Sequence, residues 1–346
     1  MREGKTLPLT GFLVSDMQQS TLKKLSEVLG ISISTVSRAL KDHPDISQNT
    51  KAKVKELALA LEYEPNNYAV QLRTQQSNVL GILVPSIDNY FYDSFIAAVE
   101  EDARLHGYSV MIMQSRDSAE LEASNLHLFR KNRIMGLFAA VSIETEDLAP
   151  FHKLEELKIP VIFVDRVVEA EGYHKVCMAD AEAARIAAEA IIRKRKKSVL
   201  ALFGHPHLSI TKTRCASLKE TFATQSSPPK IQIEFCEGSA ESKRIVLKAM
   251  KAAEKPDVIF CMGDLHLMGT MYAIHELKLK VPGDVAVISI SNGLIPTLYD
   301  PKITYVETSG YKLGKLAFSQ MFSCLKSEET QEEVIVESLL VEGGSL

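Results

Sequence analysis

The chain has 346 residues, of which 46% are hydrophobic and 24% are charged, and its formal net charge is −4. This length exceeds that of one typical domain, and the composition excludes a disordered or fibrous protein. The sequence contains no run of 18 or more apolar residues, so we expect no membrane-spanning helix and no membrane partner.

Two further features predict a cytoplasmic protein. The first residues lack the basic segment, the apolar stretch and the small-residue cleavage site of a secretory signal. The cysteines are odd in number and scattered, so they form neither a disulfide framework nor a CxxC pair, which suits a reducing compartment. They are Cys177, Cys215, Cys236, Cys261 and Cys324.

Charge is distributed unevenly along the chain. Residues 1–77 contain 10 basic and 8 acidic residues, a balance of +2, and the remainder contains 30 and 36, a balance of −6. A mildly basic N-terminal part favours a polyanionic partner for that part. Residues 1–20 show neither a helical nor a strand period, and we expect them to form a disordered extension.

Residues 21–65 have the pattern of three short helices. Apolar residues recur at helical spacing at Leu22, Leu25, Val28 and Leu29, at Val36, Ala39 and Leu40, and at Val54, Leu57, Ala58 and Leu61. Gly30 ends the first helix, Ser32 or Ser34 can cap the second, and Ser47 or Asn49 can cap the third. Two short helices joined by a tight glycine-containing turn are typical of a helix-turn-helix unit.

The second of these helices carries residues suited to reading DNA. Short polar side chains reach base edges or phosphates, and an aliphatic side chain can contact a thymine methyl group. The candidates are Ile33, Ser34, Thr35, Ser37 and Arg38. Backbone-positioning candidates are Lys41, Gln48, Asn49, Thr50 and Lys51. The alternative interpretation is a helical bundle without a role in nucleic-acid binding.

The motifs of segment 21–77 resemble the DNA-binding head of the lactose-repressor (LacI/GalR) family. The resemblance rests on Gly30, on the run Ser34-Thr35-Val36-Ser37-Arg38-Ala39-Leu40, on Ser47 and Thr50, on Tyr63-Glu64-Pro65-Asn66, and on Ala69-Val70-Gln71-Leu72-Arg73. It implies a homodimeric transcriptional regulator, by default a repressor, that binds palindromic double-stranded operator DNA. It also implies that Asn66 contributes to the DNA-binding surface.

Residues 66–77 are polar and form a linker with a short helical pattern. The family resemblance implies a hinge helix that folds on specific DNA and inserts a leucine into the minor groove. The matching residue is Leu72, with Ala69 beside it. A plain flexible tether is the alternative.

From residue 78 onward, buried-strand patterns alternate with amphipathic helices. The expected strands are Val79–Val84, Ser109–Met113, Gly136–Val141, Val161–Val164, Ser198–Phe203, Ile231–Phe235, Asp257–Met262 and Val285–Ile290. Helices fit at about 93–106, 118–132, 148–157, 181–193, 211–223, 240–253, 265–277 and 311–326. This alternation predicts an α/β core of two doubly wound parallel-sheet subdomains with a cleft between them.

The core, residues 78–346, resembles the family's ligand-binding and dimerisation core, which is similar to periplasmic sugar-binding proteins. By this match subdomain one covers about 78–166 and 304–329, and subdomain two covers about 167–303 and 330–346. Fold analogy nominates the helices at about 93–106, 118–130 and 265–277 for the dimer interface.

Loops at the carboxyl ends of parallel strands are expected to line the cleft. The candidate effector-binding residues are Ser86, Asp88, Tyr90, Phe91, Arg116, Asp165, Arg166, Asp264, Ser291 and Asn292. For each of them, loop solvation or a contact between subdomains is the alternative role.

Two positions depart from the family pattern. Ser291 stands where sugar- and purine-responsive members usually carry an aspartate, and Leu208 stands near the place of an arginine. Losing both anchors argues against a simple sugar effector. The effector is then a less polar small molecule, a protein partner controls the core, or the core is not controlled. The tail run Glu342-Gly343-Gly344 also departs from the usual arginine-glycine pair.

The sequence shows no enzymatic or cofactor motif. GxSxG, HExxH, GxGxxG and P-loop patterns are absent, so we expect no enzyme, no cofactor and no metal site. The pair His205 and His207 lacks a further ligand at metal-binding spacing. The basic run 193–197 is expected to stabilise a helix C-terminus. The leading hypothesis is a dimeric DNA-binding repressor with an effector cleft; the alternatives are a small-molecule binding protein without working DNA readout and an enzyme on the same layout.

Overall fold

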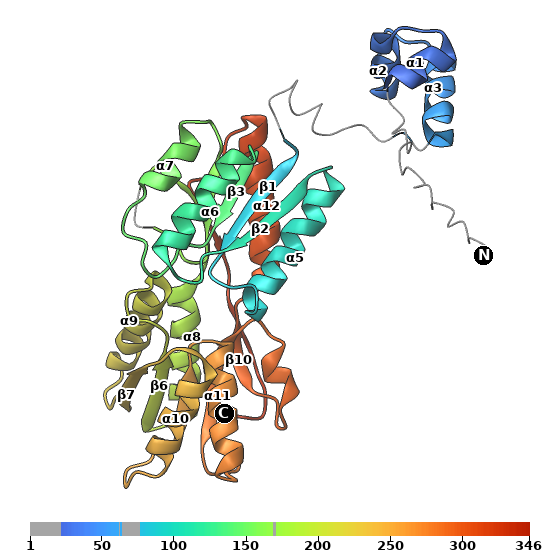
Figure 1. Cartoon of the computed structure of the whole chain (residues 1–346). Coiled ribbons are helices and arrows are strands. Elements are labelled where there is room, and N and C mark those ends of the chain that lie inside the picture. Colours follow the sequence, from blue (N-terminus) through green and yellow to red (C-terminus); the bar gives the residue numbers. More distant parts are fainter. Residues whose placement is uncertain (1–21, 62, 64–76, 169–170) are drawn as a thin grey trace, which may run out of the picture. The chain divides into compact units, whose positions relative to one another are not determined.

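The computed structural model describes residues 22–61, 63, 77–168 and 171–346. The expected extension over 1–20 and most of the expected hinge, including Asn66, Ala69 and Leu72, lie outside the described residues. The chain divides into two compact units, Met1–Gln75 and Gln76–Leu346, called the head and the core below (Figure 1).

The head consists of three helices packed around a small apolar core. They are α1 (Leu22–Leu29), α2 (Ile33–Leu40) and α3 (Gln48–Ala60). Leu25, Val36 and Val54 are fully buried at their centre. Val28 shares the helical spacing of Leu22, Leu25 and Leu29 but does not join the core, because its side chain is 60% exposed. A helix turns about 100° per residue, which places Val28 on the opposite side of Leu25 from the partly buried Leu22 and Leu29.

Capping residues fix where the head helices begin and end. Gly30, at a φ of +65°, ends α1, a conformation that glycine adopts without strain. The Ser32 hydroxyl accepts the backbone N–H of Thr35 at 3.1 Å and begins α2. Ser47 accepts the N–H of Thr50 at 3.2 Å and begins α3. Of the alternative caps considered from the sequence, Ser32 and Ser47 are therefore the ones used.

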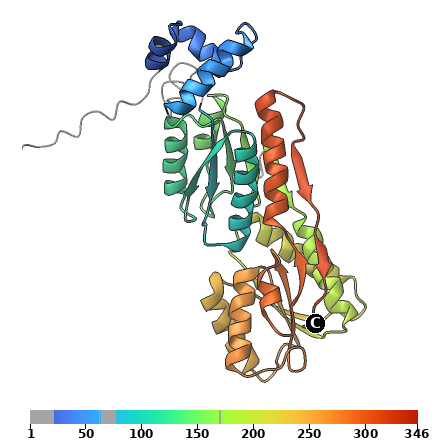
Figure 2. The ribbon, with the colours of Figure 1, turned by 90° about the vertical axis from the view of Figure 1, so that its right-hand side faces the viewer.

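The core has two lobes, one above the other in Figure 2. The N-lobe contains β1 (Val79–Val84), α5 (Tyr90–Leu105), β2 (Ser109–Gln114), α6 (Ala119–Lys131), β3 (Gly136–Ala139), α7 (Ala149–Glu155), β4 (Val161–Val164), β5 (His174–Met178), α12 (Gly310–Lys326) and β11 (Glu333–Val336). The C-lobe contains α8 (Asp180–Arg193), β6 (Ser198–Phe203), α9 (Ser209–Ala223), β7 (Lys230–Phe235), α10 (Gly238–Met250), β8 (Val258–Cys261), α11 (Asp264–Glu276), β9 (Ala286–Ser291), the 3₁₀ helix η1 (Ile295–Leu298), β10 (Thr304–Glu307) and β12 (Leu339–Val341).

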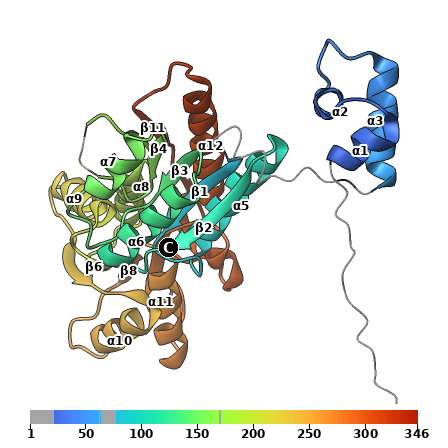
Figure 3. The same cartoon turned by 45° about the horizontal axis from the view of Figure 1, so that its top comes forward.

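Each lobe is built on a six-stranded sheet covered by helices on both faces. The strand order is β11-β5-β4-β3-β1-β2 in the N-lobe and β12-β10-β9-β8-β6-β7 in the C-lobe. All pairings are parallel except that of β10 with β12. In the N-lobe, α5 and α12 pack together on one face and α6 and α7 on the other (Figure 3). The predicted fold class, a helical head followed by two doubly wound parallel-sheet subdomains, is confirmed.

The chain passes between the lobes three times, and each passage comes later than expected. The passages lie between β5 and α8, between β10 and α12, and between β11 and β12. The boundaries placed at about 166, 303 and 329 are therefore corrected to about 179, 308 and 337. The four strands β5, β10, β11 and β12 are three to five residues long, and their short, partly polar runs gave no strand signal.

Four of the predicted strands owe their pattern to burial on both faces. Strands β3, β4, β8 and β9 are buried along their whole length, so their sequences are apolar without alternation. No helix among the described residues is long and apolar enough to cross a membrane.

Candidate functional site

The side chains of α2 proposed to read DNA lie on the surface of the head. Ile33 is 46% exposed, and Ser34 and Arg38 are also exposed. Thr35 and Ser37 are half-buried. An exposed isoleucine at the start of a short helix leaves an apolar group available for a partner, while Val36, one turn further along α2, is fully buried in the core of the head.

Hydroxyl groups gather at the N-terminus of α2. The Ser32 hydroxyl lies 2.7 Å from that of Ser34 and 2.8 Å from that of Thr35. This arrangement holds three short polar side chains in fixed positions beside helical N–H groups, and a helix N-terminus attracts anions such as phosphate. It therefore provides a pre-ordered polar surface next to Ile33.

The residues nominated at the start of α3 have different environments. Gln48 and Asn49 are exposed, and the Thr50 hydroxyl lies 2.8 Å from that of Ser47. Lys51 is 7% exposed, and its ammonium donates to the backbone carbonyl of Asp42 at 3.0 Å. The expectation that Lys51 faces the DNA backbone is therefore corrected: its ammonium donates to a carbonyl of the turn that follows α2.

A cavity of about 280 Å³ lies between the two lobes of the core. Seven of the ten nominated effector residues line it: Tyr90, Phe91, Asp165, Arg166, Asp264, Ser291 and Asn292. The remaining lining residues come mainly from the starts of helices α5, α9, α10 and α11 and from the ends of β6, β8 and β9. The cavity thus lies at the carboxyl ends of the strands, where parallel sheets place their ligands.

Ser86, Asp88 and Arg116 do not line this cavity. The Ser86 hydroxyl donates to Asp88 within the loop that follows β1. Gln114 holds this loop toward β2, because its side-chain oxygen accepts the N–H of Ile87 at 3.0 Å. Arg116 is exposed and follows β2, the edge strand of its sheet. These three side chains therefore lie to the side of the cavity.

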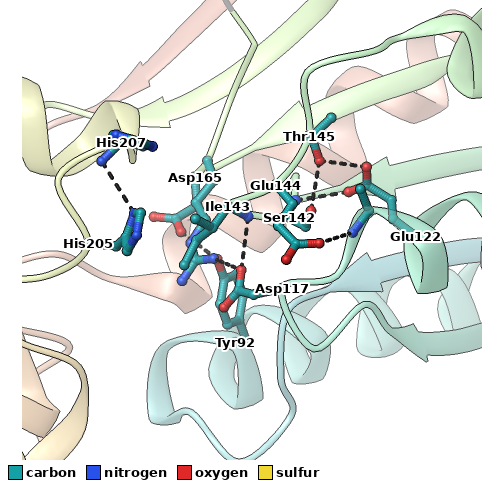
Figure 4. A network of polar contacts seen from close by, with 12 residues as sticks. Tyr92, Asp117, Glu122, Ser142, Ile143, Glu144, Thr145, Asp165, His205 and His207 are labelled. Atoms are coloured by element: carbon teal, nitrogen blue, oxygen red, sulfur yellow. Dashed lines mark hydrogen bonds and ion pairs between the residues drawn. The ribbon is translucent and has the colours of Figure 1, made fainter.

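The N-lobe wall of the cavity is a network of buried polar groups (Figure 4). The Tyr92 hydroxyl donates to Asp165 at 2.7 Å, and Tyr92 is 2% exposed. Burial and the nearby Asp165 carboxylate raise the pKa of Tyr92, so this hydroxyl stays protonated. Arg166 donates to Asp117 at 2.5 Å, and Asp117 also accepts the N–H of Ile143 at 3.2 Å.

A second set of carboxylates positions the loop that carries Ile143 into the wall (Figure 4). Glu122 is buried and accepts the N–H of Ser142 at 2.9 Å and the hydroxyl of Thr145 at 2.6 Å. Glu144 accepts the N–H of Ala119 at 3.1 Å. Burial raises the pKa of Glu122 despite these donors. The loop is thereby tied to the start of α6.

The C-lobe wall contains a carboxylate and a buried ion pair. Asp264 accepts the Ser291 hydroxyl and, at 3.3 Å, the N–H of Asn292. Burial raises the pKa of Asp264 above its usual range. Arg214 is 6% exposed; its Nε donates to Asp180 at 2.7 Å, and one Nη donates to the carbonyl of Met262 at 2.9 Å.

Asn292 links the lobes. It follows β9 of the C-lobe, and its side-chain nitrogen donates to the Tyr90 carbonyl and to the Ser94 hydroxyl, each at 3.0 Å, on α5 of the N-lobe. Its oxygen accepts the N–H of Gly310 at the start of α12 at 2.9 Å. The amide is thus a contact between subdomains, the alternative role considered for it, although the residue also lines the cavity.

Several lining residues were not nominated from the sequence. They include Tyr92, Asp117, His205, Leu208, Arg214 and His266. Tyr92, Arg214 and His266 lie inside α5, α9 and α11, whereas the strand-end rule nominates loops. These three residues share one sequence signal: each is a polar side chain within the first two turns of a helix that follows a buried strand. Among the described residues, no group of three or more histidine, cysteine or acidic side chains is placed to hold a metal ion.

Both the head and the core contain a segment that matches a known protein family. Residues 21–66 match the family described as bacterial regulatory proteins, lacI family, and residues 181–346 match the periplasmic binding protein-like domain. The head therefore matches a lacI-family regulatory domain, and the second half of the chain matches a periplasmic-binding-protein-like domain. The lacI family consists of transcriptional regulators, so the prediction that the chain is not an enzyme is confirmed.

Relatives match over nearly the whole length. The HTH-type transcriptional repressor PurR of Vibrio parahaemolyticus is 25% identical over 318 residues, which cover 91% of this chain and 95% of that protein. The ribose operon repressor of Bacillus subtilis is 24% identical over 320 residues, with the same coverage of 91% and 95%.

Solved structures share the fold. The lac repressor dimer bound to operator and the anti-inducer ONPF matches with a TM-score of 0.85 and 20% identity, covering 95% of this chain and 99% of that one. The complex of the transcriptional regulator CelR with cellobiose matches with a TM-score of 0.69 and 17% identity, covering 94% and 99%. The lacI-family fold therefore extends over both the head and the core.

Proposed function

We propose that this chain is a cytoplasmic, homodimeric transcriptional repressor that binds palindromic operator DNA and responds to a small molecule in the inter-lobe cavity. The observation that carries the proposal is a lacI-family helix-turn-helix head whose second helix presents exposed Ile33, Ser34 and Arg38. The relatives named as the transcriptional repressor PurR and the ribose operon repressor favour repression over activation.

The head supplies two kinds of DNA contact. Ile33, Ser34, Thr35, Ser37 and Arg38 on α2 are assigned to the major groove, where they read base edges or phosphates. Gln48, Asn49 and Thr50 at the start of α3 are assigned to phosphates, which fix the register of the head on the duplex. Asn66, Ala69 and Leu72 are assigned to the hinge and the minor groove on the family resemblance.

Dimerisation follows from how one such head reads DNA. A single helix-turn-helix reads one half-site, and a two-fold dimer reads a palindrome. The related lac repressor structure is a dimer on its operator. The candidate helices α5, α6 and α11 present exposed apolar side chains, among them Leu105, Leu121 and Tyr272, which are 70%, 44% and 66% exposed in the single chain. Such side chains are suited to burial against a second copy.

The cavity is the proposed effector site. It lies between two lobes that the chain joins by three passages, so a ligand that touches both walls biases their relative position. Structures of related folds contain cellobiose or D-xylulofuranose. In this chain, Leu208 and Ser291 occupy cavity positions where a sugar-binding relative usually has charged anchors, so the ligand is expected to differ from a simple sugar.

The test of the proposal is selection of bound DNA from a random duplex pool by the purified full-length protein at physiological salt. We expect a palindromic consensus with a flexible central step, because hinge insertion kinks the duplex most easily there. The binding constant of the selected site should fall steeply with salt.

Absence of enrichment by a folded, dimeric protein would contradict the proposal. It would favour the second candidate, a small-molecule binding protein whose head does not read DNA, which the well-formed cavity supports. The control is a variant in which Ser34 and Arg38, two exposed residues of α2, are changed to alanine. This variant should no longer select a consensus sequence, while its core stays folded.

A further inference from the structure

The two arginines that line the inter-lobe cavity are already paired with carboxylates. Arg166 donates to Asp117 at 2.5 Å. Arg214 donates to Asp180 at 2.7 Å and to the Met262 carbonyl at 2.9 Å. Guanidinium groups committed in this way leave little positive charge for an anionic ligand.

Two carboxylates of the same cavity have only neutral donors. Asp165 of the N-lobe is 7% exposed and accepts the Tyr92 hydroxyl at 2.7 Å. Asp264 of the C-lobe accepts the Ser291 hydroxyl and the N–H of Asn292. Within the described part of the chain, neither carboxylate has a lysine, arginine or histidine nitrogen at ion-pair distance. Buried charge of this kind is costly unless something neutralises it.

A buried histidine of the cavity lining carries an acceptor without a partner. The His266 ring lines it and is 9% exposed, and its Nε2 lies 3.2 Å from the Cys236 carbonyl. Because Nε2 must donate to that carbonyl, and because burial lowers the pKa of the ring, Nδ1 is an unprotonated acceptor. This Nδ1 is buried and has no partner. The Nε of Arg166 is likewise a buried donor without a partner among the described residues.

Aromatic surface completes the environment. Tyr90 and Phe91 line the cavity at the start of α5, and Tyr90 is 41% exposed. Glu237 adds a third carboxylate to the lining that has no ion-pair partner among the described residues. Aromatic faces beside carboxylates are the surroundings in which proteins hold organic cations.

We propose that the effector of this chain is a small organic cation, an amine or amidine, that donates hydrogen bonds to Asp165 from one lobe and to Asp264 from the other. This inference rests on the proposed function, because it takes the inter-lobe cavity as the effector site. A donor-rich cation satisfies the open acceptors of both walls, and binding both walls holds the lobes in one relative position.

The binding test uses matched compounds that differ in charge on one scaffold. Glucosamine, glucose and glucuronate form one triplet, and benzylamine, benzyl alcohol and benzoate form another; each is titrated calorimetrically into the full-length protein at millimolar concentrations. The cationic member of at least one triplet should bind about tenfold or more tightly than its neutral and anionic partners. Equal affinity within both triplets, preference for a neutral or anionic member, or no binding of either cation would overturn the proposal.

Variants connect that preference to the two carboxylates. Asp165→Asn and Asp264→Asn should each weaken binding of the preferred cation about tenfold or more. Asp93→Asn is the matched control, since Asp93 is an exposed carboxylate on α5 that does not line the cavity. Unchanged binding in both cavity variants would overturn the assignment.

Thermal stability gives a readout that needs no ligand. An uncompensated buried carboxylate kept for a ligand costs stability, so Asp264→Asn should raise the Tm of the free protein by about 2 °C. A fall in Tm would show that this carboxylate serves the fold, and would overturn the proposal.

The DNA selection separates this inference from the proposed function. A palindromic consensus together with binding of neutral or anionic compounds leaves the repressor function intact and removes only the cationic effector. Binding of cations without any DNA consensus keeps the ligand class and removes the DNA-binding function.

Discussion

The phenolic hydroxyl of Tyr92 donates to the carboxylate of Asp165 at 2.7 Å, and both side chains are more than nine-tenths buried in the N-lobe wall of the cavity. Tyr92 lies on α5 and Asp165 follows β4, so this bond ties the first helix of the lobe to the end of an interior strand of its sheet. Asp165 adopts a φ of +59°, an unusual conformation for a residue other than glycine. The bond from Tyr92 therefore helps to hold Asp165 in a backbone conformation that is unfavourable by itself.

Removing this hydroxyl should destabilise the core. Tyr92→Phe leaves Asp165 buried with no donor, and hydrogen bonds to charged groups contribute about 1.5–3 kcal/mol. We expect a loss of this size in the free energy of unfolding, measured by urea denaturation. Tyr90→Phe is the matched control, because Tyr90 is 41% exposed, and it should change the free energy little. Equal effects of the two variants would contradict the assignment.

The buried pair of Arg214 and Asp180 makes a second prediction. Arg214→Leu leaves Asp180 charged and unpaired, which should lower the free energy of unfolding by about 3–5 kcal/mol at neutral pH. Adding Asp180→Asn should recover much of the loss. Urea denaturation of the two variants measures both effects.

The same pair gives a pH dependence with a defined sign. Burial raises the pKa of Asp180 even beside Arg214, and loss of the guanidinium should raise it further. A carboxyl whose pKa is higher in the folded than in the unfolded state imposes a penalty above the folded pKa, and the penalty fades as pH falls through it. The deficit of Arg214→Leu should therefore shrink on acidification. A deficit that stays constant between neutral and acidic pH would contradict this account.

Periodicity predicted the long and fully buried elements, and it failed where the physical signal is weak. Strands such as β9 are buried on both faces and produce apolar runs that are visible in sequence. Strand β11 is an edge strand whose single neighbour is β5. Its sequence is Glu-Val-Ile-Val, and Ile335 is 56% exposed. Such a segment is defined by its partner strand, which a local pattern does not contain.

The lining of the cavity was likewise predicted only in part. Asp165 and Asp264 were found because they follow buried strands at the carboxyl edges of the two sheets. Arg214 and His266 were not nominated, because they lie within helices where a polar residue is expected to face solvent. Their burial depends on Asp180 and on the Cys236 carbonyl, which are 34 and 30 residues away in the chain.

Arg38 should contribute directly to DNA affinity. It is exposed on α2, and Arg38→Ala should weaken binding of the selected operator about tenfold or more. If Arg38 contacts a phosphate, the slope of log K against log salt should also become shallower by about 0.9. The control is Lys251→Ala, which removes an exposed cation of the core and should alter neither quantity. An unchanged binding isotherm for Arg38→Ala would argue against the contact.

Leu72 lies outside the described residues, and its role is inferred from the family resemblance, which assigns it to the end of a hinge helix that wedges the minor groove. An inserted apolar side chain unstacks a base step only where the duplex is kinked, so its contribution belongs to the specific complex. Leu72→Ala should therefore weaken binding to the selected palindrome about a hundredfold, or about 2.7 kcal/mol, while binding to random duplex, which depends on phosphate charge, stays within about twofold. Titrations against both duplexes at one salt concentration measure the two losses. Leu72→Met keeps a long apolar side chain and should restore most of the specific affinity. Equal losses on the two duplexes would show that residue 72 only tethers the head to the core.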